Sequence, residues 1–430
     1  MYPITDQLIN INSYKDNEKI GMLILDVKGN YYNQVCKYAK KYNRTDDIVV
    51  IEINGKYKYN PLDKKNIKAS VLANRLKIIM ELFSGNTSES FWIDKSEQII
   101  CEAIKLCRLY NAEYVTFEEL HNLITNKDYY NEKIKKIKEK FEKSEFNDQQ
   151  KYDLCSALNF FEKEYFALDQ RTIALLKSQI TRITNSFISD YEILNTFSPK
   201  KEESNFSGIT DIIEHGKIVI LNMNIAEYKN LSKIIAAYLK LDFQSEVLSR
   251  LSKKEDNGRA VAFISDEYHE YITENDADFY AQSREAKCIN IVATQSYKSM
   301  LKTLNNETAL SVVTQNLINK IWFRTDDSYT IEEAQKQIGK EEKEKITKSI
   351  SENAKETKYS YITNNLKSKD SSISESINSS YEKDFIFDNN YFTQNLETFS
   401  AIAFLSDGNK IIKPQKIKLI PYFMKGSDLW

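Results

Sequence analysis

The segment "RAVAFISDEYHEY", residues 259–271, contains the two signals that decide the fold. Its apolar run is continuous rather than alternating, which is typical of a strand buried on both faces of a parallel sheet. Two adjacent carboxylates, Asp266 and Glu267, follow this run directly. At the carboxyl edge of a parallel sheet, side chains project into the crevice where ligands bind. The segment therefore predicts an α/β domain with an acidic site at the end of one strand.

Similar Ile- and Val-rich runs recur along the chain and support this interpretation. They are "IGMLILDV" (20–27), "DIVVIEI" (47–53), "KIVILNM" (217–223), "INIVATQ" (289–295), "NKIWFR" (319–324) and "AIAFLSD" (401–407). Amphipathic helical patterns separate several of the runs, for example at residues 230–251. Alternation of strands and helices predicts an α/β fold with a mainly parallel sheet.

A long helical region interrupts the series of strands. Residues 70–198 contain almost no strand signal, and helical patterns occur at 95–111, 130–143 and 170–188. We therefore expect an all-helical domain inserted between two parts of the α/β core, residues 1–69 and 199–430. The polar, Ser-rich segment 355–384 predicts a mobile loop or a weakly ordered hairpin.

Composition excludes several classes of protein. The 430 residues are enough for two or three units, and the net charge of −2 excludes a polycation, so any contact with nucleic acid must come from a local patch. Five cysteines without a C-x-x-C pair and three scattered histidines favour neither a disulfide framework nor a zinc module, and suit a reducing compartment. No apolar run approaches the roughly 20 residues that cross a bilayer.

Polar residues near the strand ends suggest chemistry on a phosphate. An aspartate such as Asp266 can hold Mg²⁺ directly or through water, and Glu267 can orient or deprotonate a water for attack on a γ-phosphate. Gln295 follows a neighbouring strand, where a glutamine can sense the γ-phosphate or the attacking water. Arg284 could neutralise charge across a subunit boundary. These residues also have non-catalytic interpretations. Asp266 and Glu267 could simply begin a helix, and Arg284 could be an ordinary surface arginine.

Several motifs occur in the order found in one known family. They are "LILDVKGNYY" (23–32), "YNPLD" (59–63), "KIVILNMN" (217–224), "AFISDEYHEYI" (262–272), "QSREAKCINIVATQS" (282–296), "IWFRTDD" (321–327) and the closing segment 399–423. On these motifs the chain resembles the type IV secretion coupling proteins, the TraG/TraD-like conjugation ATPases of the HerA/FtsK group. The resemblance spans nearly the whole chain and implies a RecA-like P-loop NTPase core with an inserted all-helical domain.

The resemblance also implies roles for individual residues. Asp266 and Glu267 would be the Walker B residues, and Asp266 would hold the metal. Gln295 would be the sensor and Arg284 the arginine finger. Asp26 and Lys28 would lie beside the nucleotide crevice. Asp26 and Lys28 could instead fix a turn with Gly29.

The implied function is ATP-driven transfer of DNA and relaxase in conjugation. The expected cofactors are ATP and Mg²⁺, and the expected partners are single- or double-stranded DNA, relaxase and relaxosome proteins, the secretion channel and five further copies in a hexamer. Such a protein is expected in the cytoplasm at the inner face of the cell membrane. Membrane contact would be made only through an N-terminal segment that this sequence does not show.

One expected element is missing from the sequence. Gly-Lys occurs at residues 55–56, 216–217 and 339–340, but Ser or Thr never follows, so no phosphate-binding loop is recognised. The segment 2–14 resembles the helix that would follow such a loop. We therefore expect an N-terminally truncated member of the family, with negligible ATP hydrolysis and weak nucleotide affinity as it stands. Two alternatives are a degenerate, non-catalytic paralogue that acts as an interaction module and, from "DEYH", a superfamily 2 (DExH) helicase.

Overall fold

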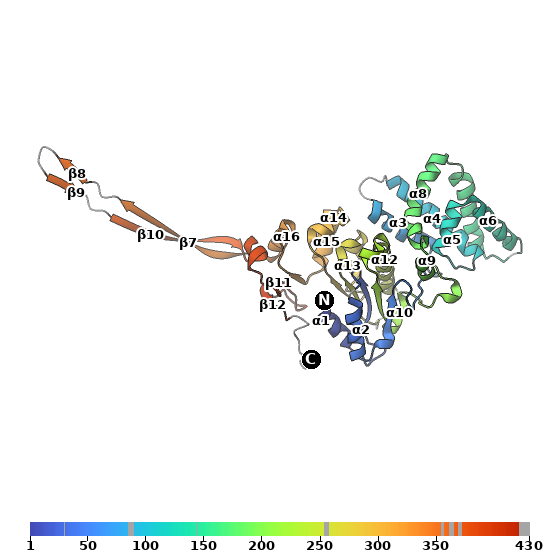
Figure 1. Cartoon of the computed structure of the whole chain (residues 1–430), viewed down its shortest axis with the longest axis horizontal. Coiled ribbons are helices and arrows are strands. Elements are labelled where there is room, and N and C mark those ends of the chain that lie inside the picture. The colour runs from blue at the N-terminus through green and yellow to red at the C-terminus, as the bar shows by residue number, and fades with distance from the viewer. Residues whose placement is uncertain are drawn as a thin grey trace. The chain divides into compact units, whose positions relative to one another are not determined.

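The structure of the chain is a computed structural model. It describes residues 1–29, 31–84, 90–143, 145–252, 258–353, 357–360, 365–368 and 372–420 (Figure 1). The chain divides into two compact units, Met1–Leu317 and Ile318–Trp430. Within the described ranges, no helix is both long enough and apolar enough to cross a bilayer.

Unit 1 is built on a five-stranded parallel sheet with the strand order β2-β3-β1-β4-β5. The strands are β1 (Gly21–Asp26), β2 (Ile48–Ile51), β3 (Ile218–Asn222), β4 (Val261–Ser265) and β5 (Cys288–Val292). All six residues of the central strand β1 are buried. The predicted parallel α/β sheet is therefore confirmed, and the continuous apolar runs reflect burial on both faces.

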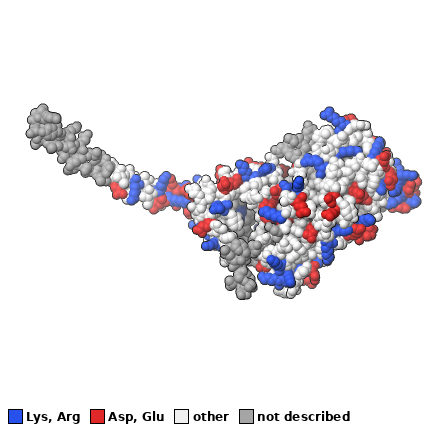
Figure 2. Space-filling model, viewed as in Figure 1, with Lys and Arg blue, Asp and Glu red and all other residues white. Residues whose placement is uncertain are grey.

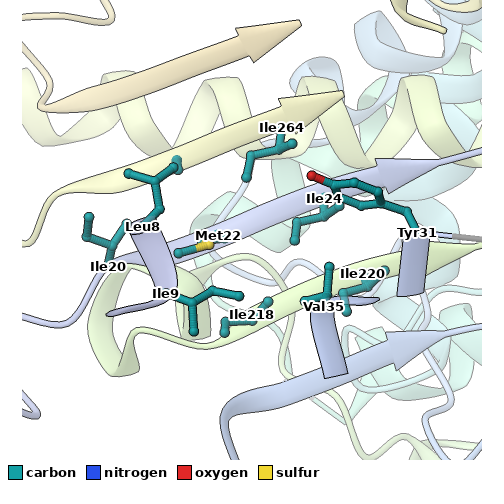
Figure 3. Close-up of a cluster of buried hydrophobic side chains, with 11 residues drawn as sticks. Leu8, Ile9, Ile20, Met22, Ile24, Tyr31, Val35, Ile218, Ile220 and Ile264 are labelled. Carbon is teal, nitrogen blue, oxygen red and sulfur yellow. The ribbon is translucent and has the colours of Figure 1, made fainter. Parts of the chain in front are cut away.

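Helices cover both faces of this sheet. The helices of unit 1 outside the α3–α9 region are α1 (Tyr2–Asn10), α2 (Tyr31–Lys41), α10 (Thr210–His215), α11 (Ile225–Tyr228), α12 (Asn230–Ser252), α13 (Asn275–Gln282), α14 (Tyr297–Leu304) and α15 (Glu307–Asn316). Side chains of α1 and α2 pack on one face in the cluster of Figure 3, where Leu8 lies near Met22 and Val35 lies beside Ile220. Phe243 of α12 stacks on Phe263 of β4, with ring centroids 5.9 Å apart.

After β2, and before α10 leads into β3, the described residues form a run of seven α-helices. They are α3 (Ala69–Ser84), α4 (Ser90–Tyr110), α5 (Phe117–Thr125), α6 (Lys127–Glu142), α7 (Asp148–Asn159), α8 (Gln170–Ile188) and α9 (Tyr191–Phe197), and no strand occurs among the described residues of this region. Capping boxes fix two of the helix starts, for example Thr116 with Glu119 before α5. The stacked rings of Phe117 and Phe187, 3.8 Å apart, join α5 to α8.

A buried charge cluster attaches these helices to the sheet unit. Asp242 of α12 is fully buried and accepts hydrogen bonds from Arg75 of α3 (2.7 Å) and Tyr59 (3.2 Å). Its second cation is Lys64, at 2.8 Å. Tyr59 and Lys64 lie within and just after the "YNPLD" segment. That motif therefore works as the joint between the sheet unit and its helical region.

Unit 2 contains the last two apolar runs, and there the strands pair antiparallel rather than parallel. The strands β6 (Lys320–Trp322), β11 (Ser400–Phe404) and β12 (Gln415–Lys418) form a separate antiparallel sheet in the order β12-β11-β6. Helix α16 (Ser328–Ile338) packs on it through Ile331 and Ile338. All five residues of β11 are buried, as its apolar run predicts. An apolar run does not determine whether the strand pairs parallel or antiparallel.

A long antiparallel ribbon completes unit 2. It pairs β7 (Lys340–Asn353) with β10 (Ser372–Phe385), and the shorter strands β8 (Thr357–Ser360) and β9 (Asn365–Ser368) pair between them. The hairpin alternative for residues 355–384 is thus confirmed where residues are described. Residues 355–356, 361–364 and 369–371 of that prediction lie outside the described residues.

Candidate functional site

The carboxyl edge of the parallel sheet brings together five of the six predicted residues. β4 lies between β1 and β5, so the segments that follow these three strands are neighbours. The Asp266 amide donates to the Leu25 carbonyl at 3.2 Å, and the Tyr268 amide donates to the Ala293 carbonyl at 2.9 Å. The residues assembled at this edge are Asp26, Lys28, Asp266, Glu267 and Gln295.

The turn that carries the acidic pair has an unusual backbone. Glu267 has a φ angle of 47°, in the left-handed region that non-glycine residues rarely adopt. Tyr271 supports this turn, because its buried hydroxyl donates to the Asp266 carbonyl at 2.7 Å and lies 2.6 Å from the Ser265 hydroxyl. A residue held in a sparsely populated conformation persists only where its surroundings fix it, and such residues cluster at functional sites.

The Glu267 carboxylate contacts a cation on one oxygen and an amide on the other. Its Oε1 atom pairs with the Lys28 ammonium group, which also lies 3.8 Å from Asp266 Oδ2. Its Oε2 atom accepts a hydrogen bond from Gln295 Nε2 at 3.1 Å. The hydrogen bond to Glu267 raises the pKa of Lys28. Lys28 is half exposed and Glu267 is buried, so the lysine is the movable member of the pair.

Asp26 holds the turn that carries Lys28. It is fully buried, and its Oδ1 atom accepts the backbone amides of Lys28 and Gly29, both at 3.0 Å. Its Oδ2 atom accepts the amide of Tyr31, the first residue of α2, at 2.6 Å. Gly29 has a φ angle of 76°. These bonds support the turn-fixing interpretation of Asp26, and a direct contact with a nucleotide remains a prediction.

Arg284 is the predicted residue that the fold does not bring to this edge. It lies between α13 and β5, is exposed, and precedes the first residue of β5, Cys288, in the same connection. The carboxylates follow the ends of parallel strands, whereas Arg284 precedes the start of one. Within one chain it therefore lies at the opposite edge of the sheet, and its action on a neighbouring subunit remains a prediction.

Comparison with models of known protein families identifies the family of this chain. Residues 17–379 match the model of the type IV secretion-system coupling protein DNA-binding domain. The chain belongs to the family of type IV secretion-system coupling proteins. No curated protein matches the sequence.

Solved structures of a bacterial conjugative coupling protein share the fold of this coupling protein chain. TrwBΔN70 in its unbound monoclinic form is 13% identical, with a TM-score of 0.58 over 93% of this chain and 78% of TrwB. TrwB in complex with the ATP analogue ADPNP is 12% identical, with the same TM-score and coverage. TrwB in complex with ADP and Mg²⁺ is 13% identical, with a TM-score of 0.58 over 93% of this chain and 78% of TrwB. The RecA-like core with a helical domain is thus confirmed as the fold.

The coupling protein site includes two polar residues that the sequence analysis did not select. His269 is largely buried, with Nδ1 at 3.5 Å from Glu267 Oε2 and 3.3 Å from the Thr294 hydroxyl. Asn222 ends β3 and donates to Glu52 at 2.7 Å. The histidine of "DEYH" and the asparagine that closes "KIVILN" were visible signals, because polar residues at the ends of buried strands point to the same sheet edge.

A second buried network supports the acidic turn from behind. Lys240 of α12 and Asp276 of α13 are both fully buried and form an ion pair at 2.6 Å. The Tyr268 hydroxyl donates to Asp276 at 2.5 Å, and Lys240 donates to the Tyr271 carbonyl at 2.7 Å. Burial lowers the pKa of Lys240. Tyr268 follows Glu267 directly and Tyr271 lies three residues later, so this network fixes the segment that shapes the turn.

The donor set suits a magnesium ion that is shared with a nucleotide. Within the described part of the chain, no group of three or more His, Cys, Asp or Glu residues could hold a metal alone. Mg²⁺ is usually bound by one or two carboxylates, waters and substrate phosphates rather than by a protein cage. Asp266 is partly exposed at the sheet edge and offers such a carboxylate. The residues present therefore fit Mg²⁺ together with a nucleotide.

Proposed function

We propose that this edge is the catalytic half of an ATP site that drives conjugative DNA transfer. The observation that carries the proposal is the convergence of Lys28, Asp266, Glu267 and Gln295 after three adjacent parallel strands. When bound, ATP and Mg²⁺ would supply the γ-phosphate and the cation that neutralises its charge. Asp266 would hold the cation, Glu267 would take a proton from the attacking water, and Gln295 would orient that water.

The contacts of Glu267 describe a resting state of this site. A general base needs a free oxygen within hydrogen-bond reach of the water, but Lys28 and Gln295 now occupy both oxygens. A phosphate group offers Lys28 a stronger anionic partner than a single carboxylate. We therefore infer that Lys28 leaves Glu267 when phosphates enter, which frees the base only in the loaded site.

The wider assembly follows from the family and is part of the proposal. The expected partners are DNA, relaxase and relaxosome proteins and the secretion channel, in a homo-hexamer at the inner face of the membrane. The helical region of α3–α9 would contact the relaxase–DNA substrate. Arg284 would act on the nucleotide of the adjacent subunit, since it lies far from the site of its own chain.

The phosphate-binding loop decides how the proposal is tested. No Gly-Lys-Ser/Thr occurs in the sequence, so the amides and lysine that cradle phosphates are not recognised. We expect isothermal titration of the chain with Mg-ATP to show weak binding and no measurable turnover; micromolar affinity would contradict this. The same absence favours the second candidate, a non-catalytic interaction module, and this candidate gains if a grafted loop restores no ATP binding.

The catalytic assignment is tested in a chain that carries a grafted phosphate loop. Glu267→Gln should abolish turnover and preserve ATP binding, because glutamine keeps the shape but cannot accept the proton. Glu270→Gln is the matched control, since Glu270 lies in the same turn but pairs with Lys233. Unchanged turnover in Glu267→Gln would show that Glu267 is not the base.

Mixing inactive subunits tests the role of Arg284. Loss of an arginine finger lowers turnover by roughly 10³-fold in other systems and affects the transition state more than binding. Rings that mix loop-grafted Arg284→Ala and Glu267→Gln chains should regain part of the activity, because some boundaries then contain an intact arginine and an intact glutamate. If mixed rings form but stay inactive, Arg284 does not act across the boundary.

A further inference from the structure

The β7–β10 ribbon has a regular register that assigns every side chain to a face. Fourteen residue pairs oppose one another, from Lys340 with Phe385 to Asn353 with Ser372. Directly opposed residues of an antiparallel pair lie on the same face, and successive residues of a strand alternate between faces. The register therefore sorts the described side chains of residues 340–351 and 374–385 into two sets.

One face of the ribbon collects its exposed apolar side chains. Ile346 opposes Ser379, Ile377 opposes Lys348, Tyr381 opposes Glu344 and Ile350 opposes Glu375. The exposed fractions are 58% for Ile346, 68% for Ile350, 59% for Ile377 and 71% for Tyr381. In the order Tyr381, Ile346, Ile377, Ile350, each residue is the diagonal neighbour of the next across the two strands. Diagonal neighbours lie within reach of one another, so the four form one continuous apolar stripe.

The opposite face carries polar and charged side chains. Its pairs are Glu341 with Asp384, Lys343 with Glu382, Lys345 with Ser380, Thr347 with Asn378, Ser349 with Ser376 and Ser351 with Ser374. Ion pairs such as Lys345 with Glu382, at 3.3 Å, form on this face. The ribbon is therefore amphipathic, although none of these described side chains on either face is buried.

An amphipathic ribbon of this kind lacks the support that ribbons normally need. A two-stranded ribbon is marginally stable in water unless a further strand or layer covers its apolar face. Single exposed apolar residues are ordinary, but contiguous apolar surface rimmed by polar residues marks an interaction site. The stripe of Tyr381, Ile346, Ile377 and Ile350 meets this description.

The charge of the ribbon restricts what can cover it. Residues 340–351 and 374–385 include five lysines and six acidic residues, and Figure 2 shows both signs along the described part of the ribbon. Such a balance gives no positive field to attract a phosphate backbone or an anionic membrane. The suitable partner is apolar along one stripe and carries both charges beside it, and the ribbon itself has these properties.

We propose that the stripe face of the β7–β10 ribbon binds the same face of a second copy of this chain. In a twofold arrangement with the strands aligned, β7 of one copy lies over β10 of the other. Ile346 then lies over the small Ser379 of the second copy, between its Tyr381 and Ile377, so the two stripes interdigitate. Lys348, which pairs with Glu375 of its own copy at 3.7 Å, then lies beside Glu375 of the second copy. The face is thus complementary to itself in shape and in charge.

The area of the stripe face determines the affinity that we expect for the proposed dimer. Each of the twelve described residue pairs adds about 3.3 Å to the length of the face, which is about 10 Å wide. The contact would therefore bury roughly 400 Å² of surface per copy and roughly 800 Å² in total. This is below the standard size of stable interfaces, so we expect weak, reversible association in the range of tens of micromolar.

Sedimentation velocity of the whole chain over about 1–200 μM tests the proposal. Ile350→Lys introduces a charge into the stripe, and the adjacent Ser349→Lys introduces the same charge on the opposite face. The wild type and Ser349→Lys should dimerise alike, whereas Ile350→Lys should raise the dissociation constant at least about tenfold. Circular dichroism checks that both variants fold as the wild type does.

Three outcomes would overturn the proposal. They are a wild type that stays monomeric over this range, association that both lysine variants weaken equally, and association that neither weakens. A duplex oligonucleotide is added as a separate arm. Binding of the oligonucleotide that Ile350→Lys abolishes and Ser349→Lys preserves would assign the face to nucleic acid instead of to a second copy.

Discussion

The central strand β1 and the ribbon strand β10 make different use of apolar residues. All six residues of β1 are buried, with a parallel neighbour on each side and helices over both faces. The described side chains of β10 are exposed from Ser374 to Asp384, with one neighbouring strand. An apolar residue in β1 stabilises the fold, whereas Ile377 in β10 remains in contact with water. Similar side chains therefore support folding in one region and are available for association in the other.

The buried ion pair behind the acidic turn should give the largest effect in unit 1. Lys240→Met removes the cation and leaves Asp276 buried without it, and breaking a buried pair in this way costs roughly 3–5 kcal/mol. Urea unfolding followed by circular dichroism measures the loss. The double variant Lys240→Met with Asp276→Leu removes both charges and should recover a large part of it. A loss below about 1 kcal/mol in the single variant would mean that the pair does not support the fold.

A cavity in the sheet should come next. Ile220 of β3 is fully buried in the cluster of Figure 3, so Ile220→Ala should lower the free energy of unfolding by about 2–5 kcal/mol. Chemical denaturation at several protein concentrations gives the value free of association. A loss of only a few tenths of a kcal/mol would remove the contrast between the sheet and the ribbon.

Lys320 tests a charged residue in a covered strand of unit 2. Burial lowers the pKa of Lys320 to about 8, whereas the unfolded chain titrates near 10.5. The unfolded state therefore binds more protons between these values, so unit 2 should gain stability as the pH rises from about 8 to about 10.5. The gain amounts to at most about 3 kcal/mol. Lys320→Met should remove this rise, and an identical rise in the variant would assign it to another group.

The ribbon should show the smallest effect. Ile377 is 59% exposed, so Ile377→Ala should change the free energy of unfolding of the monomer by less than about 0.5 kcal/mol. The measurement is made in dilute solution, where the proposed dimer is dissociated. A loss comparable to that of Ile220→Ala would show that the stripe is covered within the monomer, which contradicts its availability to a second copy.

Burial and strand ends were predictable from the sequence, whereas direction and assembly were not. The runs around Ile24, Ile220 and Ile264 predicted the sheet, because continuous apolar residues are needed where both faces are covered. The run at 401–407 has the same character but lies in an antiparallel sheet, since neighbours distant in sequence determine the pairing. The amphipathy of the Ser-rich segment was hidden, because it depends on a register between strands about 30 residues apart.

The candidate site divides in the same way. Asp266, Glu267, Gln295 and Lys28 were predictable from their positions after buried runs. The support of Lys240 was not, because α12 shows no local signal for a contact with a segment some 30 residues downstream. The role of Arg284 depends on a neighbouring subunit, which the sequence of one chain cannot place.

Helix α12 has a mechanical consequence for the molecule. Lys240 holds the segment behind the acidic turn, and Asp242 holds Arg75 of α3 in the helical region. The two residues are separated by about 3 Å along the helix axis and point to different sides. The helix is therefore held by buried charged contacts on two sides, one behind the acidic turn and one in the helical region. A displacement of the acidic turn that moves Lys240 would therefore also be felt at Asp242 and at the Arg75 it binds, because both contacts are made by one continuous helix.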